Sequence, residues 1–559
     1  TVSEIQSLAT LALSALAKIE AYNNGNGTTP SALTVQDYVD GGIENVTVDN
    51  LAAVNAQVLA ASTGGADSVP EITAHVNTAN TALAKVEAYN NGDGSSPSAL
   101  LIADYEAVGV TGVSADNLVA VNAQVLSSAT GETDTVAEIQ AKVGAADAGI
   151  AKVEAYNNGN GTFPPALDEA DYAAIGINGV SGDNLAAVNA QVLASATGET
   201  NTVTEIQGKV VAADAALAKI EAYNNGDGVT PAPLVAQDYV DAGITGVIAD
   251  NLAAVNAQVL ASAFGEANSV SEIQSKVVDA NAAIAKVEAY NNGNGTTPAA
   301  LVLGDYTGVG VVGVNSGNLA AINAQVLSAN TGEANSVAEI QSFVVDAQNA
   351  LAKIEAFNNG DGTSPAPLGL QDYLDAGITG VTSGNLVAVN TQVLAAATGQ
   401  ADTVPEILVK VGDAIAALAK IEAYNNGDGS SPAALTINDY QAVGVTGVSA
   451  DNLAAVNAQV LASAPGETDI VSEIQSKVSD ANNAIAKVEA YNNGDGTTPS
   501  ALTAADYSAA GVSGVTPDNV AAVNAQVLAA AAGDTDTVSE IQSYVAPADA
   551  ALAKIEAYN

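Results

Sequence analysis

A period of 67 residues runs through this chain from end to end without a single insertion or deletion. Three columns of equivalent residues show the period most clearly. The first column is aromatic, the second is tyrosine and the third is proline: Tyr22, Tyr89, Tyr156, Tyr223, Tyr290, Phe357, Tyr424, Tyr491 and Tyr558; Tyr38, Tyr105, Tyr172, Tyr239, Tyr306, Tyr373, Tyr440 and Tyr507; Pro30, Pro97, Pro164, Pro231, Pro298, Pro365, Pro432 and Pro499. A strict period of this length is typical of stacked copies of one supersecondary unit, each burying its apolar face against its neighbours.

The repeat also sets the domain boundaries. The segment Thr-Val-Ser-Glu-Ile-Gln opens the chain at Thr1 and returns at Thr537, eight periods later. We therefore expect eight repeats and one additional first helix. The repeats cover residues 1–67, 68–134, 135–201, 202–268, 269–335, 336–402, 403–469 and 470–536, and the terminal helix covers 537–559.

The first part of each repeat predicts a long amphipathic helix, over residues 1–23 in the first copy. Its apolar residues, such as Val2, Ile5 and Ile19, follow one another at steps of three and four. Thr1 and Glu4 form a capping-box pattern. The copies that start with Val-Pro-Glu place Pro70 and Pro405 in the first helical turn, where a missing N–H is harmless.

The rest of the repeat predicts two shorter helices. The turn-forming loop Asn23–Pro30 ends the long helix, and Thr34 with Asp37 caps a short helix that stops at Gly41-Gly42. A third helix begins near residues 47–50 and ends at Thr63-Gly64, while residues 43–48 are the only candidate strand. The fold class expected is all-α: a tandem array of three-helix repeats that forms an elongated rod or superhelix rather than flexible beads.

Lysine spacing gives a further local prediction. Five lysines outside the column of Lys18 each lie four residues after a glutamate: Lys142, Lys209, Lys276, Lys410 and Lys477. This is the favourable orientation for an ion pair along a helix, so pairs such as Glu138–Lys142 are expected.

Charge and composition limit the classes of function. The chain has 62 acidic and 14 basic residues and a formal net charge of −48. Such a field repels nucleic acids and anionic membranes, so cations and other copies of the repeat are the expected partners. The acidic surface also has a plainer explanation, since it keeps a long chain soluble. No stretch of 18 uninterrupted apolar residues and no signal-like segment is present, so membrane insertion is not expected of the sequence as given.

The residue types needed for repeated catalysis are scarce. The chain has no cysteine and one histidine, His75, which rules out disulfides, thiol chemistry and a recurring catalytic triad. We therefore expect a protein that is not an enzyme. The asparagine column that begins at Asn55 lies among apolar positions, and it is interpreted as a buried amide that bonds a nearby loop or helix end.

The loop after each long helix is the only repeated polar constellation, and it carries the candidate metal ligands. The candidates form three columns: Asn24, Asn91, Asn158, Asn225, Asn292, Asn359, Asn426 and Asn493; Asn26, Asp93, Asn160, Asp227, Asn294, Asp361, Asp428 and Asp495; Asp37, Asp104, Asp171, Asp238, Asp305, Asp372, Asp439 and Asp506. Ca²⁺ takes six or more oxygen ligands around a tight turn, and these residues could supply them.

This loop resembles the calcium loop of EF-hand and dockerin modules. The resemblance implies that Asn24, Asn26 and Asp37 match the third, fifth and last ligand positions, with Gly27 as the turn glycine and Leu33 as the apolar anchor. It departs from the pattern in two ways: Tyr22 stands where the first Asp belongs, and about four extra residues around Pro30 lengthen the loop. The alternative is a plain helix stop, with Asp37 placed at a helix N-terminus.

The whole repeat is similar to repeats in very large, secreted, adhesin-like surface proteins of bacteria. The motifs that carry this resemblance are Thr-Val-x-Glu-Ile-Gln, Gly-Val-Thr-x-Asp-Asn-Leu-Ala-Ala-Val-Asn and Asn-Gly-Asp-Gly. It implies an extracellular or cell-surface location and a role as a stalk, spacer or filament, stabilised by Ca²⁺ if the loop binds it. Two alternatives stay open: a surface-layer or filament subunit that polymerises end to end, and a repeat array that binds small ligands or glycans.

Overall fold

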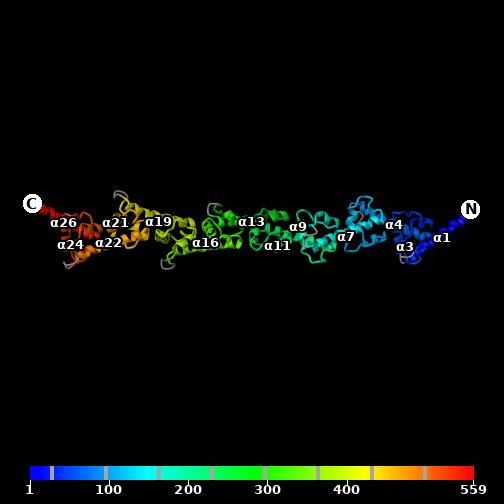
Figure 1. Ribbon diagram of the computed structural model, residues 1–559, viewed down its shortest axis with the longest axis horizontal. Coiled ribbons are helices and arrows are strands. Elements are labelled where there is room, and N and C mark those ends of the chain that lie inside the picture. Colours follow the sequence, from blue (N-terminus) through cyan, green and yellow to red (C-terminus); the bar gives the residue numbers. More distant parts are fainter. Residues whose placement is uncertain are drawn as a thin grey trace. The chain divides into compact units, whose positions relative to one another are not determined.

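The computed structural model describes residues 1–25, 31–92, 98–159, 165–226, 232–293, 299–360, 366–427, 433–494 and 500–558. It divides into two units, Thr1–Asn281 and Ala282–Asn559, and the boundary falls inside one long helix. Each unit consists of successive three-helix repeats (Figure 1). The described residues contain no β-strand, so the predicted all-α tandem array is confirmed.

The long helices begin each repeat, as the capping pattern predicts. They are α1 (Val2–Asn24), α4 (Val69–Asn90), α7 (Val136–Asn158), α10 (Val203–Asn224), α13 (Val270–Asn292), α16 (Val337–Asn358), α19 (Val404–Asn425) and α22 (Val471–Asn492). Thr1 and Glu4 form the expected reciprocal capping box. At Ile470, which has no side-chain acceptor, only half of the box remains, because Glu473 accepts the Ile470 N–H at 3.3 Å.

The short and third helices complete the repeats. The short ones are α2 (Val35–Asp40), α5 (Ile102–Ala107), α8 (Glu169–Ala174), α11 (Ala236–Asp241), α14 (Leu303–Val309), α17 (Leu370–Asp375), α20 (Ile437–Ala442) and α23 (Ala504–Ala509). The third ones are α3 (Leu51–Ala60), α6 (Leu118–Leu126), α9 (Leu185–Leu193), α12 (Leu252–Ala261), α15 (Leu319–Ser328), α18 (Leu386–Ala395), α21 (Leu453–Ala462) and α24 (Val520–Ala529).

The candidate strand at residues 43–48 is not a strand. Ile43 and Val46 are buried in the repeat, but a side chain rather than a neighbouring strand holds the segment. Asn50 accepts the Thr47 N–H at 2.7 Å and donates to the Asn45 carbonyl at 2.7 Å. A single amide thus satisfies backbone groups that a sheet would otherwise pair.

The terminal helix of residues 537–559 is broken, contrary to the expectation of one helix. It consists of α25 (Val538–Ser543) and α26 (Val545–Tyr558), with Tyr544 between them. Pro547 lies in the first turn after the break. Because proline has no N–H and its ring clashes with the carbonyl four residues earlier, the helix cannot run regularly past Ser543.

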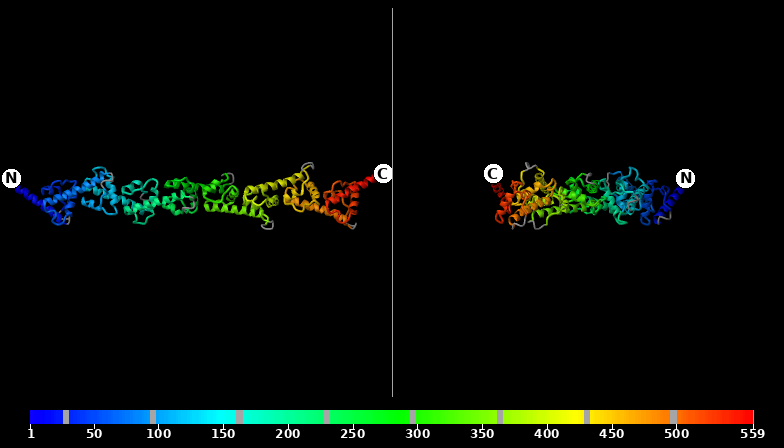
Figure 2. Two further views of the ribbon diagram at one scale, coloured as in Figure 1. Left: turned by 180° about the vertical axis from the view of Figure 1, so that it is seen from behind. Right: turned by 60° about the vertical axis from the view of Figure 1, so that its left-hand side comes forward.

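A long helix such as α4 serves two repeats, because it packs on α3 of the preceding repeat and on α5 and α6 of its own. In the first unit, the second half of α1 packs on α2 and α3 of its own repeat, and α3 then packs on α4 of the next repeat. These helices lie together at the blue end of the chain in all the views (Figures 1 and 2). The shared core includes Ile19, Tyr38, Val54 and Ile72, which are all fully buried. The core therefore continues from one repeat into the next.

A glycine allows the short helix of one repeat to approach the third helix of the previous one. Gly42 ends α2 with φ +79°, and the Ile43 N–H bonds the Tyr38 carbonyl at 2.9 Å, as in a Schellman motif. The equivalent Gly109 lies against α3, where an added Cβ would stand 2.5 Å from the Cβ of Ala56. Glycine is needed at Gly109 for two reasons: its φ is positive, and its Cα lies too close to Ala56 for a side chain.

Amide side chains link successive repeats. Gln57 of α3 donates to the carbonyl of Ala107 at the end of α5. Gln140 of α7 accepts the Thr111 N–H and donates to the Thr111 carbonyl, both at 2.9 Å. The Val203 N–H reaches past one whole repeat and bonds the carbonyl of Asp116 at 3.3 Å.

The predicted ion pairs along the long helices take a different form. Lys142 pairs with Glu132 at 3.5 Å rather than with Glu138, and Lys209 and Lys477 pair with the equivalent Glu199 and Glu467 at 3.8 and 3.6 Å. The Glu138 carboxylate is held by the cap at Thr135, which leaves the lysine to a glutamate in the preceding loop.

Candidate functional site

The aspartate of the short helix is the predicted site residue whose surroundings the structure describes most fully. In the first repeat, Asp37 Oδ1 accepts a hydrogen bond from Lys18 Nζ at 2.6 Å. Asp37 Oδ2 accepts from the N–H and the hydroxyl of Thr34, both at 2.8 Å. The carboxylate therefore pairs with the long helix and caps its own helix at the same time.

The same pair occurs in every repeat. The equivalents are Lys85–Asp104 at 2.6 Å, Lys152–Asp171, Lys219–Asp238 at 2.5 Å, Lys286–Asp305 at 2.5 Å, Lys353–Asp372 at 2.5 Å, Lys420–Asp439 at 2.5 Å and Lys487–Asp506 at 2.6 Å. A cation that used this aspartate would share it with, or displace, the lysine ammonium.

The electrostatic environment favours the charged form of the aspartate. Partial burial alone would raise the pKa of Asp37, but the hydrogen bonds from Lys18 and Thr34 and the charge of Lys18 outweigh it, so the pKa lies below its ordinary value. The pKa of Asp439 is lowered against the same desolvation by Lys420 and Thr436. Asp37 and Asp439 are therefore negatively charged at neutral pH.

The asparagines at the end of the long helices, such as Asn24, precede the loop that leads to the short helix with Asp37. Asn24 Oδ1 accepts the N–H of Gly64, which follows α3, at 3.1 Å, and Asn225 and Asn292 accept from Gly265 and Gly332 at 3.3 and 3.1 Å. The other members of the column stand at the C-terminal ends of their long helices: Asn91, Asn158, Asn359, Asn426 and Asn493.

The middle column of predicted ligands lies outside the described residues: Asn26, Asp93, Asn160, Asp227, Asn294, Asp361, Asp428 and Asp495. The calcium loop therefore stays a prediction. Among the residues that the structure describes, no cluster of three or more His, Cys, Asp or Glu side chains is present. A calcium site here would depend on amide and backbone oxygens as well as on the Asp37 column.

Asn23, which directly precedes the Asn24 column, was not predicted from the sequence to have a role. Asn23 Nδ2 donates to the carbonyls of Val58 and Ala61 at 2.8 and 2.9 Å, and so caps the end of α3. Its Oδ1 is buried and has no hydrogen-bond partner among the described residues. The same is true of Asn90, Asn157, Asn224, Asn291, Asn358, Asn425 and Asn492. Asparagine in every copy, directly after the aromatic column, was the signal available in the sequence.

The Asn55 column has the structural role that was predicted. Asn55 Oδ1 accepts from the Tyr38 hydroxyl at 2.8 Å, and its Nδ2 donates to the Leu33 carbonyl at 3.0 Å. Burial, with the nearby Tyr22 and Asp37, raises the pKa of Tyr38 far above its ordinary value. The tyrosine therefore stays a neutral donor that fixes the short helix to the third helix.

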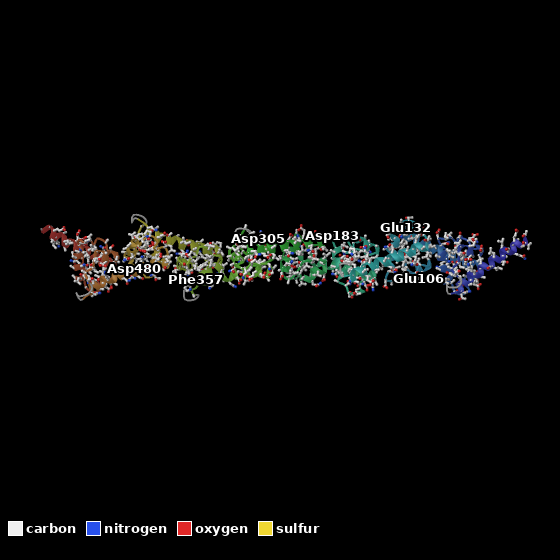
Figure 3. The ribbon with its side chains drawn as sticks, in the orientation of Figure 1. Glu106, Glu132, Asp183, Asp305, Phe357 and Asp480 are labelled. Atoms are coloured by element: carbon white, nitrogen blue, oxygen red, sulfur yellow. The ribbon has the colours of Figure 1, made fainter. Side chains whose placement is uncertain are left out.

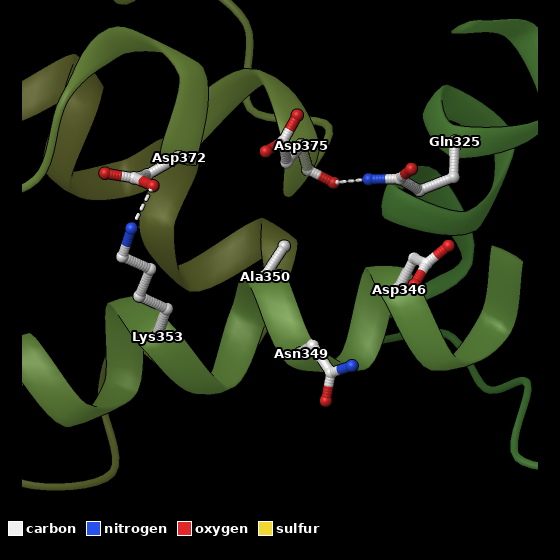
Figure 4. Close-up of a pocket in the computed structure, with 7 residues that line it drawn as sticks. All are labelled: Gln325, Asp346, Asn349, Ala350, Lys353, Asp372 and Asp375. Atoms are coloured by element: carbon white, nitrogen blue, oxygen red, sulfur yellow. Dashed lines mark hydrogen bonds and ion pairs between the residues drawn. The ribbon is translucent and has the colours of Figure 1, made fainter. Parts of the chain in front are cut away.

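A groove in the second unit has a volume of about 380 Å³ and is lined by Asp346, Asn349, Lys353, Asp372 and Asp375, among others. Some of its polar groups already have structural partners (Figure 4): Lys353 pairs with Asp372, and Gln325 donates to the Asp375 carbonyl at 2.6 Å. His75, the single histidine, bonds the Gly65 carbonyl at 2.8 Å.

The outer surface is acidic in both units. Glu106, Glu132 and Asp183 in the first unit and Asp480 in the second are exposed (Figure 3). Such an acidic surface attracts cations. No protein-family model, curated protein or solved structure matches the chain.

Proposed function

We propose that this protein is a structural spacer: a helical repeat array that forms a stalk or filament section of a surface protein. One observation carries the proposal. Several recurring polar residues that the structure describes hold a repeat together or hold it to the next one, as with Tyr38 and Asn55 inside a repeat and Gln57 between repeats.

The hydrogen bonds between successive repeats support a mechanical rather than a catalytic role for the repeat. Gln191, Gln325 and Gln459 repeat the bond of Gln57 to the end of the following short helix, at 2.6–2.7 Å. Side-chain amides keep these bonds at any pH and salt concentration, because they carry no charge. Neighbouring repeats with a shared core resist independent motion, which a spacer requires.

Composition supports the extracellular location. The chain has no Cys and no Met, so it offers no sulfur to oxidants, and its charge of −48 keeps a long array soluble. The similarity to adhesin-like stalk repeats has the same implication.

Immunogold electron microscopy of intact cells that produce the protein tests this location and role. The proposal predicts gold particles outside the cell envelope, at a distance from it that shrinks when internal repeats are deleted. Label confined to the cell interior, or a distance independent of repeat number, contradicts the proposal.

The orphaned Asn23 oxygens favour a second role, stabilisation by Ca²⁺. A buried amide oxygen without a donor is costly, and eight oxygens that have none within the described ranges adjoin the predicted calcium loops. Ca²⁺ accepts such oxygens as ligands. Binding to the folded state alone would add about 2.7 kcal/mol per site at a hundredfold excess over the dissociation constant.

Calorimetry with Ca²⁺ on the full chain tests this role, with NaCl of equal ionic strength as the control for screening. Stoichiometric binding and a melting shift that NaCl does not reproduce support it. Asp104→Asn should then abolish one binding equivalent. If Asp104 serves only Lys85 and the helix cap, the variant loses the same stability with and without Ca²⁺, and no heat of binding appears at millimolar Ca²⁺.

A further inference from the structure

Two grooves in the second unit occupy equivalent places in successive repeats. The first has a volume of about 240 Å³ and lies between the loop before α15, the second half of α16 and the residues just before α19. The second has a volume of about 230 Å³ and lies one period of 67 residues further along, between the loop before α18, the second half of α19 and the residues just before α22. Each groove is therefore built by three successive repeats.

The sequence departs from the repeat at both grooves. Gly317 lines the first groove and Gly384 lines the second. The same column holds aspartate in the other six copies: Asp49, Asp116, Asp183, Asp250, Asp451 and Asp518. A Cβ added to Gly317 would stand 2.7 Å from the Cγ2 of Thr403. The grooves therefore lie at the two junctions where this column has no side chain.

A buried asparagine also loses a hydrogen bond at both grooves. At the six other junctions the equivalent asparagine donates to a backbone carbonyl and to an Asn or Asp of the next long helix, as Asn184 donates to Asp214 at 2.7 Å. Gln348 and Ile415 replace that acceptor in the two grooves. Asn318 is 5% exposed, and its Nδ2 keeps only the bond to a backbone carbonyl, at 2.7 Å, within the described residues. One N–H of this amide is thus left unused in the wall of the first groove.

Two carboxylates line the first groove without a cationic partner. Asp402 Oδ1 is buried and accepts no hydrogen bond from the described residues. Glu355 of α16 is partly buried, and its carboxylate also has no partner there. Burying a carboxylate oxygen without a donor or a counter-charge is costly, so a cation in the groove would stabilise it. The equivalent carboxylates Glu422 and Asp469 line the second groove.

The size and the walls of the groove fit an organic cation better than a bare metal ion. Its volume of about 240 Å³ exceeds the roughly 150 Å³ of a cavity that holds benzene. Leu351, which is 6% exposed, and Ala352 add an apolar wall. An ammonium group donates up to three hydrogen bonds and so can serve two carboxylates. An oxygen atom on the same molecule would accept the unused N–H of Asn318.

We propose that the two grooves bind small amino alcohols, which combine an ammonium group with a hydroxyl oxygen. In the first groove the ammonium group donates to Glu355 and Asp402, and the hydroxyl oxygen accepts from Asn318. The residues with the same roles in the second groove are Glu422, Asp469 and Asn385. This inference does not depend on the spacer role or on the calcium loops, since none of these residues belongs to the predicted calcium ligands.

Methyl NMR of the full chain, titrated with propanolamine, tests the proposal. The methyl groups of Leu351 and Leu418, which line the two grooves, should show saturable shifts at millimolar concentrations. Leu217 is the internal control, because it is the equivalent leucine of a repeat in which Asp214 still occupies the asparagine, and its shift should not saturate. Butylamine has the same length but no oxygen, and it should bind at least about threefold more weakly.

Removing one carboxylate should weaken one groove alone. Asp402→Asn should weaken binding at Leu351 by about tenfold, because it removes a charge-assisted hydrogen bond, and should leave Leu418 unchanged. The variant should fold, because other copies carry asparagine in this column, as at Asn201. The matched control is Glu221→Gln, an equivalent loss of charge in the fourth repeat, which should alter neither titration.

Restoring the missing acceptor tests the role of the hydroxyl group. Gln348→Asn gives Asn318 the acceptor that Asn251 finds in Asn281 at 2.8 Å, so the preference for propanolamine over butylamine should disappear in the first groove.

The proposal is overturned if Leu351 shows no saturable shift, if Leu217 shifts with the same concentration dependence, or if Asp402→Asn leaves the binding unchanged. Equal affinity for the two amines in the wild type would overturn the choice of amino alcohols. A saturable shift that calcium chloride produces and propanolamine does not would assign the grooves to a metal ion and would also overturn the proposal.

Discussion

Gly109 lies so close to Ala56 of the preceding repeat that a Cβ added to the glycine would stand 2.5 Å from the Ala56 Cβ. The same glycine has φ +78°, which side chains rarely adopt. Local backbone and packing between repeats therefore both require glycine at this column.

Replacing a junction glycine should destabilise an inner repeat more than the first one. An added Cβ at Gly243 would stand 2.7 Å from the Ala186 carbonyl oxygen, whereas Gly42 has nothing within 4 Å and a similar positive φ. Gly42→Ala should lower the local stability by about 1 kcal/mol from backbone strain alone. Gly243→Ala should lower it by about 2 kcal/mol or more, because the clash adds to the strain.

Hydrogen exchange of the amides around each glycine measures both effects in the full chain, where global unfolding need not be two-state. Gly42→Ala is the matched control for backbone strain. Equal losses in the two variants would show that the close approach at the junction contributes nothing.

Replacing a buried, unpaired hydroxyl should stabilise the protein. Thr133 is fully buried and its Oγ1 has no partner in the part of the chain that the structure describes, while the same column holds alanine at Ala66 and Ala267. Thr133→Val keeps the shape and removes the unsatisfied group, so we expect a gain of about 1 kcal/mol. The control is Thr135→Val: Thr135 accepts the Glu138 N–H at 3.2 Å, and its loss should lower stability by about 1 kcal/mol.

Thermal melting of the two variants decides this prediction. A lower melting temperature for Thr133→Val would mean that the hydroxyl has a donor or acceptor in solution.

Acid should weaken the ion pairs between the long and short helices. Against the effect of its burial, Lys420 and Thr436 lower the pKa of Asp439 in the folded state. A lowered folded pKa gives a stability contribution that is complete above the unfolded value of about 3.9 and disappears as the pH falls through the folded pKa. Since Lys420 is half exposed, the pair should contribute only a few tenths of a kcal/mol.

Carboxyl NMR titration of Asp439 in the wild type and in Lys420→Met tests the cause. The variant should raise the pKa of Asp439, because it removes the ammonium but keeps the aliphatic stem. An unchanged pKa would assign the shift to the cap at Thr436 alone.

The sequence predicted the helices well because their ends are encoded locally. Thr1 with Glu4 and Thr34 with Asp37 are capping boxes that need no distant partner. The buried role of Asn55 followed from an amide among apolar positions. The capping boxes depend on residues only three positions apart, and the burial of Asn55 was indicated by its immediate neighbours.

Features that depend on packing between repeats were not predicted. Gln140 and Thr111 lie 29 residues apart, and nothing in either segment indicates that they meet. The predicted ion pair between Glu138 and Lys142 was wrong, because the capping box already engages the Glu138 carboxylate. The break in the terminal helix at Tyr544 was not predicted, because the effect of Pro547 was not considered. The calcium ligands depend in part on loop residues outside the described ranges.

The proposed spacer role requires that neighbouring repeats of the first unit form one stiff array, and spin-label distances measure this directly. The chain has no cysteine, so labels can be placed cleanly at Ala84, Ala151 and Ala218, equivalent exposed positions in three successive repeats. Electron double resonance should give narrow distributions, with the Ala84–Ala218 distance about twice the Ala84–Ala151 distance. Broad distributions, with an Ala84–Ala218 distance only ~1.4 times the Ala84–Ala151 distance as for a flexible chain of beads, would contradict the claim.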